Sequence, residues 1–177
     1  MFKKYWKFFV IFWSVVLVGI IGVFVFFWLI SAGKLGFMPT FEELENPNNR
    51  FASEVYFADG PIMNRYFEKE NRKYIEYREI PQSVIDALIA TEDVRFYDHS
   101  GVDVRGLFRV AKGLLTANTS AGGGSTISQQ LAKMLFPRES DLNVFELAIR
   151  KFREWVIAVR LEKSYTKEEI LTMYLNK

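Results

Sequence analysis

Glu92 is the first residue of this 177-residue chain whose type and position suit catalysis. It follows the apolar run Val84–Ala90. Ile85, Leu88 and Glu92 fall on one helical stripe, because side chains three and four positions apart share a face. We therefore expect Glu92 at the end of a core-facing stripe, next to Phe96. Burial favours the protonated form of a carboxyl group, which suits a proton-transfer catalyst. The alternative interpretation is a solvated acid that ends a helix.

Glu154 is the second carboxylate of interest. It lies four residues after Arg150 and three after Lys151, so an ion pair on a helix surface is the ordinary explanation. Two carboxylates across a cleft are also the usual catalytic residues of enzymes that act at the anomeric carbon of a sugar. The spacing of Glu92 and Glu154 does not by itself show that they meet.

A glycine run precedes an expected helix start at residues 122–133. Thr126 and Gln129 have the spacing of a capping box. The exposed N–H groups of such a helix start form a general anion site. The Gly-Lys-Ser/Thr ending of a nucleotide P-loop is missing, so we exclude that class. Basic side chains nearby suit a pyrophosphate, and a solvated helix face is the alternative explanation for them. These side chains are Lys133, Arg138, Arg150, Lys151 and Arg153.

Composition excludes several other kinds of site. The chain has no cysteine, which rules out disulfides and thiolate metal sites, and His99 is its single histidine. The net charge of +2 is too small to indicate nucleic-acid binding. Two Ser-x-x-Lys sequences, at residues 31–34 and 164–167, match the acylation motif of transpeptidases. They lack the accompanying Lys-Thr-Gly and Ser-x-Asn, and we attribute both to chance.

The N-terminus predicts a membrane anchor. Residues 1–7 carry three lysines, and residues 8–30 contain no charged residue. At 1.5 Å per residue this run can cross a hydrocarbon core of about 30 Å. A cleaved signal peptide is the alternative, although its apolar core would be shorter. Lysines before the span and acids after it predict that residues 1–7 lie in the cytoplasm. The chain after the span then lies on the outer side of the membrane.

The remaining chain divides into a linker with a small hairpin, residues 31–80, and a helical domain, residues 81–177. Strand-like runs at 52–57 and 62–67 flank the turn sequence Ala58–Pro61. Helices are expected from Pro81 to Thr91, over 104–115, from Thr126 to before Phe136, over 144–163, and from Thr166 through Leu175. The expected core face of the helix over 144–163 consists of Phe145, Ile149, Phe152, Val156 and Val159.

Three ordered motifs resemble the peptidoglycan glycosyltransferase domain of class A penicillin-binding proteins, glycosyltransferase family 51. The first is Glu92-Asp93-x-x-Phe96-x-x-His99-x-Gly101, and the second is Gly124-Ser125-Thr126-Ile127-Ser128-Gln129-Gln130-Leu131-x-Lys133. The third is Arg150-Lys151-x-x-Glu154, continuing to Lys167-x-Glu169-Ile170-Leu171-x-x-Tyr174-Leu175-Asn176. Three motifs in order behind one anchor are specific, and they cover roughly Pro81 to the end.

The resemblance implies a mainly α-helical, lysozyme-like fold and a division of roles. Glu92 matches the general base that deprotonates the acceptor 4-hydroxyl, and Glu154 matches the carboxylate near the leaving pyrophosphate. We expect Glu154 to stay charged and to orient the cations. The matching donor-site residues, which hold phosphates and sugar, are Ser125, Thr126, Gln129, Gln130, Lys133, Arg150 and Lys151.

The implied substrate is lipid II, polymerised into glycan strands on the outer, periplasmic face of the cytoplasmic (inner) membrane. The resemblance implies no required cofactor and leaves a divalent metal, Mg or Mn, open, together with partners among cell-wall synthesis proteins. The family continues beyond the position that matches Lys177, so we expect an N-terminal fragment with little activity of its own. A lysozyme-like enzyme that cleaves glycan and an inactive membrane-anchored remnant remain the alternatives.

Overall fold

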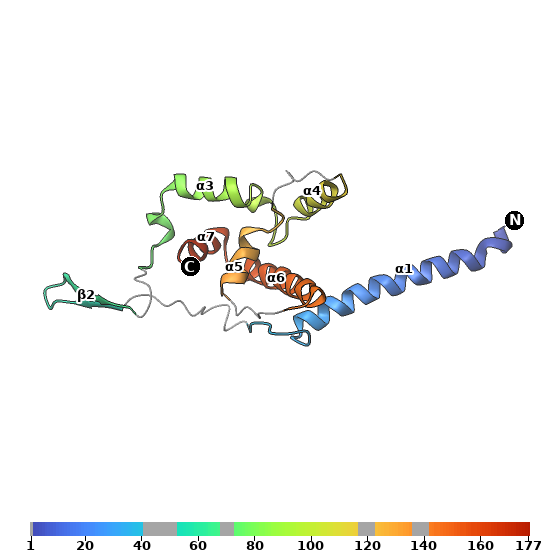
Figure 1. The fold of residues 1–177 in the computed structure, drawn as a ribbon, viewed down its shortest axis with the longest axis horizontal. Coiled ribbons are helices and arrows are strands. Elements are labelled where there is room, and N and C mark those ends of the chain that lie inside the picture. The colour runs from blue at the N-terminus through green and yellow to red at the C-terminus, as the bar shows by residue number, and fades with distance from the viewer. Residues whose placement is uncertain (1, 41–52, 68–72, 117–122, 136–141) are drawn as a thin grey trace. The chain divides into compact units, whose positions relative to one another are not determined.

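The computed structural model describes residues 2–40, 53–67, 73–116, 123–135 and 142–177 (Figure 1). These residues form two compact units, each described by itself. One consists of residues 1–38 and 142–156, and the other of residues 39–141 and 157–177. The helix α6, Val144–Ser164, begins in the first unit and ends in the second.

The first unit contains α1, Phe2–Ser31, which extends the predicted span at its N-terminal end. Its segment Tyr5–Ser31 is long and apolar enough to cross a membrane, a test that a signal sequence also passes. Near its C-terminal end, Phe26 and Phe27 lie edge-on to Phe152 of α6, with ring centroids 5.4 and 5.7 Å apart. Aromatic rings favour this edge-to-face geometry.

The core face predicted for α6 is wrong. Phe145 is 71% exposed, whereas the residues of α6 that are buried are Arg153, Glu154, Ile157, Ala158 and Leu161. The sequence pattern ranked side chains by hydrophobicity alone. Two charged side chains, Arg153 and Glu154, are buried instead, and Oε2 of Glu154 lies 3.1 Å from Nζ of Lys151. Such pairing lowers the cost of burying a charge.

The predicted hairpin is confirmed in the second unit. Strands β1, Ser53–Tyr56, and β2, Ile62–Tyr66, pair antiparallel, with Ser53 opposite Tyr66. A register irregularity lies between Val55 and Tyr56. The turn closes through a hydrogen bond from the Phe57 N–H to the Pro61 carbonyl, 2.8 Å long.

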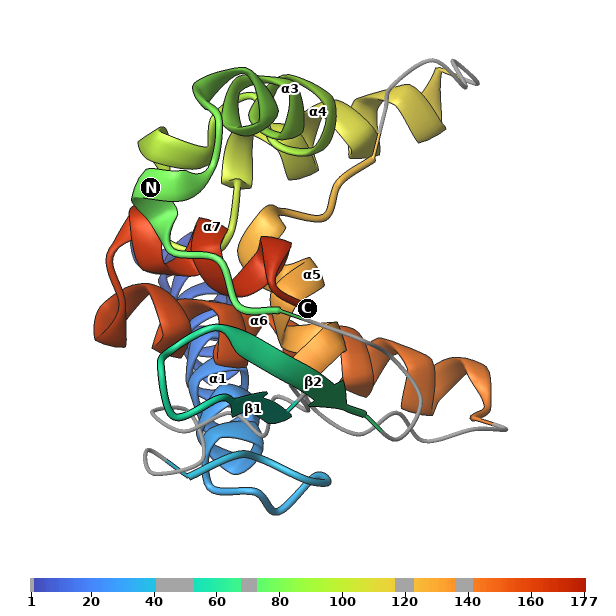
Figure 2. The same ribbon diagram turned by 90° about the vertical axis from the view of Figure 1, so that its left-hand side faces the viewer.

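The predicted helices of the second unit are confirmed as well. A 3-10 helix, Tyr77–Glu79, precedes α3, Gln82–Glu92, and a second, Phe96–Asp98, follows it. Then come α4, Val104–Leu115, α5, Ile127–Leu135, the end of α6, and α7, Lys167–Leu175. Helices α5 and α7 are in contact (Figure 2). The buried apolar residues of this unit include Ile85, Phe96, Ile127, Leu131, Leu161, Ile170 and Leu171.

A capping box and a glycine fix the positions of these helices. Thr166 and Glu169 form the predicted reciprocal capping box at the start of α7. Gly101 has φ of +91°, and a Cβ there would lie 2.8 Å from the α6 backbone at Ala158 and Val159. Glycine adopts this conformation without a steric penalty, and its lack of a side chain leaves room for the close approach. Gly101 therefore lets the loop after α3 pack directly on α6.

Candidate active site

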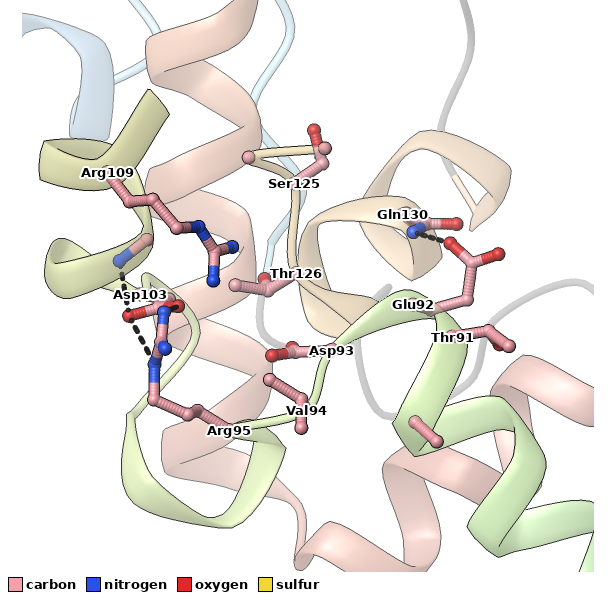
Figure 3. Close-up of a pocket in the computed structure, with 14 residues that line it drawn as sticks. Thr91, Glu92, Asp93, Val94, Arg95, Asp103, Arg109, Ser125, Thr126 and Gln130 are labelled. Carbon is pink, nitrogen blue, oxygen red and sulfur yellow. Dashed lines mark hydrogen bonds and ion pairs between the residues drawn. The ribbon is translucent and has the colours of Figure 1, made fainter. Parts of the chain in front are cut away.

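A cavity of about 460 Å³ opens in the second unit where α3, α4 and α5 converge (Figure 3). Its lining comes from the end of α3 and the loop after it, from the start of α4, and from the segment that enters α5. The charged and polar residues of the lining include Glu92, Asp93, Arg95, Asp103, Arg109, Ser125, Thr126 and Gln130.

Glu92 is the last residue of α3 and faces this cavity. Its Oε2 accepts a hydrogen bond of 2.7 Å from Nε2 of Gln130 on α5. The expectation that Glu92 is buried is wrong: Ile85 is 1% exposed, but Glu92 is exposed. The stripe leaves the core at the end of α3, where the helix opens onto the cavity. A carboxylate placed there can meet a ligand from solvent.

Asp93 ties the loop after α3 to the start of α5, a role that the sequence analysis missed. It is 7% exposed, and both its carboxylate oxygens lie 3.1 Å from Nε2 of His99. Its Oδ2 also accepts the N–H of Ile127, the first residue of α5, over 3.1 Å. An anionic side chain is favoured at a helix N-terminus. Asp93 therefore holds its neighbour Glu92 in place against α5.

The start of α5 is fixed by the carbonyl of Gly101. The Thr126 hydroxyl donates to that carbonyl over 2.7 Å, and Nε2 of Gln129 donates to it over 3.2 Å. Thr126 also accepts the Gln129 N–H, so half of the predicted capping box forms. Both side chains are buried. Their contacts position α5, and substrate binding by Gln129 stays a prediction, as it does for Ser125 at the cavity wall.

Two arginines line another part of the cavity, which the sequence analysis also missed. Arg95 forms an ion pair with Asp103, and Arg109 extends from α4 into the same region (Figure 3). Desolvation alone would raise the pKa of Asp103. The hydrogen bonds from Arg95 and from the Gly106 N–H, with the charge of Arg95, outweigh it and lower that pKa. The cavity lining as a whole carries three carboxylates, Glu92, Asp93 and Asp103, and two guanidinium groups, Arg95 and Arg109.

Tyr174 of α7 contacts Gln130, the residue that hydrogen-bonds Glu92. Its hydroxyl donates to Oε1 of Gln130 over 3.0 Å. Desolvation by burial raises the pKa of Tyr174, and the charge of Glu92 raises it further. The phenol therefore keeps its proton and remains a donor over the physiological range.

Comparison with known proteins identifies the family. Residues 59–177 match the family model described as transglycosylase. The chain belongs to the transglycosylase family. It is 39% identical over 140 residues to penicillin-binding protein 1A of Escherichia coli, covering 79% of this chain and 16% of that protein. The corresponding protein of Haemophilus influenzae is 39% identical over 149 residues, which is 84% of this chain and 16% of the relative.

A third relative, penicillin-binding protein 1A of Vibrio cholerae, is 33% identical over 162 residues, covering 92% of this chain and 18% of the relative. The chain thus spans less than a fifth of the length of these relatives. The resemblance inferred from the three motifs is confirmed at the level of the family.

The predicted site residues of this transglycosylase sequence fall into two groups, one in each compact unit. The structure brings Glu92, Ser125, Thr126 and Gln130 to one cavity, while Lys133 lies on α5, outside its lining. The predicted residues Arg150, Lys151 and Glu154 belong to the other unit. There Lys151 and Glu154 form the expected ion pair, with Nζ and Oε2 3.1 Å apart and Glu154 buried. Their roles toward substrate stay predictions, and Arg138 lies outside the described residues.

Proposed function

We propose that this chain forms the glycosyltransferase portion of an enzyme that polymerises lipid II into peptidoglycan strands and releases undecaprenyl pyrophosphate. The observation that carries the proposal is the carboxylate of Glu92. One of its oxygens is held by Gln130, and it lines a cavity that also contains Arg95 and Arg109. Membership of the transglycosylase family supports the same reaction. The proposal concerns the complete protein, because the chain matches a small part of its relatives.

Glu92 acts in the proposed reaction as the general base. It takes the proton of the acceptor 4-hydroxyl, whose oxygen then forms a bond to the anomeric carbon of the donor sugar. The bond between that carbon and the pyrophosphate oxygen breaks, and the lipid pyrophosphate leaves with the electron pair. Removing the hydroxyl proton in the transition state is the ordinary contribution of a positioned carboxylate.

Cations stabilise the leaving pyrophosphate in this scheme. Lys133, Arg150 and Lys151 supply them, and Glu154 orients Lys151 through the 3.1 Å ion pair. Charge-assisted hydrogen bonds to phosphate are stronger than neutral ones. Arg109, which lines the cavity, supplies a further guanidinium group for an anionic ligand.

The proposed site of action is the outer face of the cytoplasmic membrane. Helix α1 anchors the chain, with residues 1–7 in the cytoplasm, and the substrate reaches the enzyme through its own lipid tail. Among the described residues no group of three or more histidine or acidic side chains lies together as a metal site. Participation of a divalent metal, Mg or Mn, stays a prediction. Other cell-wall synthesis proteins are expected partners.

The test is incubation of the complete protein with labelled lipid II in detergent or lipid vesicles. Chains that lengthen, with release of lipid pyrophosphate, support the proposal. Shortening of preformed glycan would instead show a lysozyme-like activity. No change in either substrate would show a remnant that binds without turnover.

A further inference from the structure

The two oxygens of the Glu92 carboxylate differ in their surroundings. Oε2 accepts the 2.7 Å hydrogen bond from Gln130. Among the residues that the structure describes, none hydrogen-bonds Oε1. An acid–base catalyst needs one oxygen available within hydrogen-bond reach of the proton that it moves. The contact from Gln130 thus distinguishes the oxygens before substrate arrives.

The orientation of the Gln130 amide decides whether this distinction exists. An amide offers two donors on its nitrogen and acceptor lone pairs on its oxygen. With Nε2 toward Glu92 the contact is attractive, whereas with the amide turned over, Oε1 would face the carboxylate and repel it. Gln130 is held at its backbone, where its N–H donates to the Thr126 carbonyl, and at the two ends of its amide by Glu92 and Tyr174.

Tyr174 holds the Gln130 amide in the attractive orientation. The Glu92 carboxylate only accepts, which favours Nε2 toward it, and at the other end of the amide the Tyr174 hydroxyl donates to Oε1 of Gln130 over 3.0 Å. The raised pKa of Tyr174, caused by desolvation and by Glu92, keeps that donor protonated. One chain of hydrogen bonds therefore runs from α7 through α5 to the end of α3.

We propose that Tyr174 is a positioning residue, which acts through Gln130 to hold Oε2 of Glu92 and to present Oε1 as the oxygen that takes the acceptor proton. The step balances: the proton moves from the 4-hydroxyl to Oε1, while the Nε2–Oε2 hydrogen bond remains. Tyr174 itself neither gives nor receives a proton. This inference rests on the proposed function, because it assigns an atom to the proposed base.

The experiment is a double-mutant cycle in the complete protein, with kcat and KM measured on lipid II. Tyr174→Phe removes only the hydroxyl, and Gln130→Met keeps the length of the side chain without its donor. Losing one neutral hydrogen bond should lower kcat about 3–10-fold in Tyr174→Phe, with KM nearly unchanged. In the Gln130→Met background the same change should alter kcat by less than about twofold, because coupled residues are non-additive. Tyr66→Phe, on exposed β2, is the matched control and should leave kcat unchanged.

Three outcomes would overturn the inference. Equal losses of kcat from Tyr174→Phe in both backgrounds would mean that the hydroxyl acts without Gln130. A raised KM with unchanged kcat would mean that Tyr174 binds substrate directly. Wild-type protein that fails to polymerise lipid II would remove the proposed function itself, an outcome distinct from active wild type with an additive cycle.

Discussion

Gly101→Ala should be among the most damaging single-methyl changes in the second unit. Two costs combine at this position. A non-glycine residue at φ of +91° carries strain of about 1–2 kcal/mol. The new Cβ would also lie 2.8 Å from backbone atoms of Ala158 and Val159, well inside ordinary carbon contact distances of about 3.5–4.0 Å. Overpacking of this kind costs about 1–3 kcal/mol, because a helix backbone cannot turn aside as a side-chain tip can.

The summed loss is therefore about 2–5 kcal/mol, a large share of an ordinary stability of about 5–15 kcal/mol. Turnover should fall too, since the Gly101 carbonyl holds Thr126 and Gln129 at the start of α5. The assay is thermal unfolding followed by circular dichroism, in detergent. At roughly 4–8 °C per kcal/mol for a domain of about 100 residues, Tm should fall by about 10 °C or more.

Gly60→Ala is the matched control for backbone strain. Gly60 also has a positive φ, +104°, but a Cβ there would meet nothing within 4 Å. It should therefore cost about 1–2 kcal/mol at most, the strain alone. Equal losses of stability in the two variants would refute the argument that close approach to α6 explains Gly101.

Two further predictions concern charges. Because the pKa of Asp103 is lowered in the fold, its contribution to stability is present above the unfolded value, near 3.8, and is lost as pH falls through the lower folded pKa. Asp103→Asn should thus cost about 1 kcal/mol at neutral pH in denaturant unfolding, and the difference from wild type should shrink in acid; a difference independent of pH would contradict this. Lys133→Ala and Lys151→Ala should each weaken binding of a phosphoglycolipid inhibitor by about tenfold or more, while Lys163→Ala, on the exposed end of α6, should not. Unchanged affinity in both of the first two variants would count against the donor-site assignment.

Local chemistry explains why so many elements were predictable from sequence. The start of α7 follows from Thr166 and Glu169, which are three residues apart and cap the helix without help from the rest of the chain. The hairpin likewise follows from its turn residues at 58–61. The family resemblance rests on motifs whose spacing is itself local.

The contacts that build the site could not be predicted in this way. Asp93 meets Ile127 across 34 residues, and Gln130 meets Glu92 across 38. Periodicity reports the apolar side of a helix and not the residues that another element brings against it. For the same reason the pattern predicted a buried Glu92, although α3 ends at the open cavity. It also predicted the wrong buried face for α6. The Glu-Asp pair with a single histidine six residues later was the one available signal for the Asp93–His99 contact.

The most direct test of the central claim is the turnover of lipid II by the complete protein carrying Glu92→Gln. The amide keeps the shape of the side chain but cannot accept the hydroxyl proton. Loss of a general base predicts a fall in turnover of about 10²-fold or more, with lipid II still bound and the thermal unfolding midpoint retained. Near-normal turnover in this variant would contradict the assignment of Glu92 as the base and, with it, the mechanism proposed for this cavity.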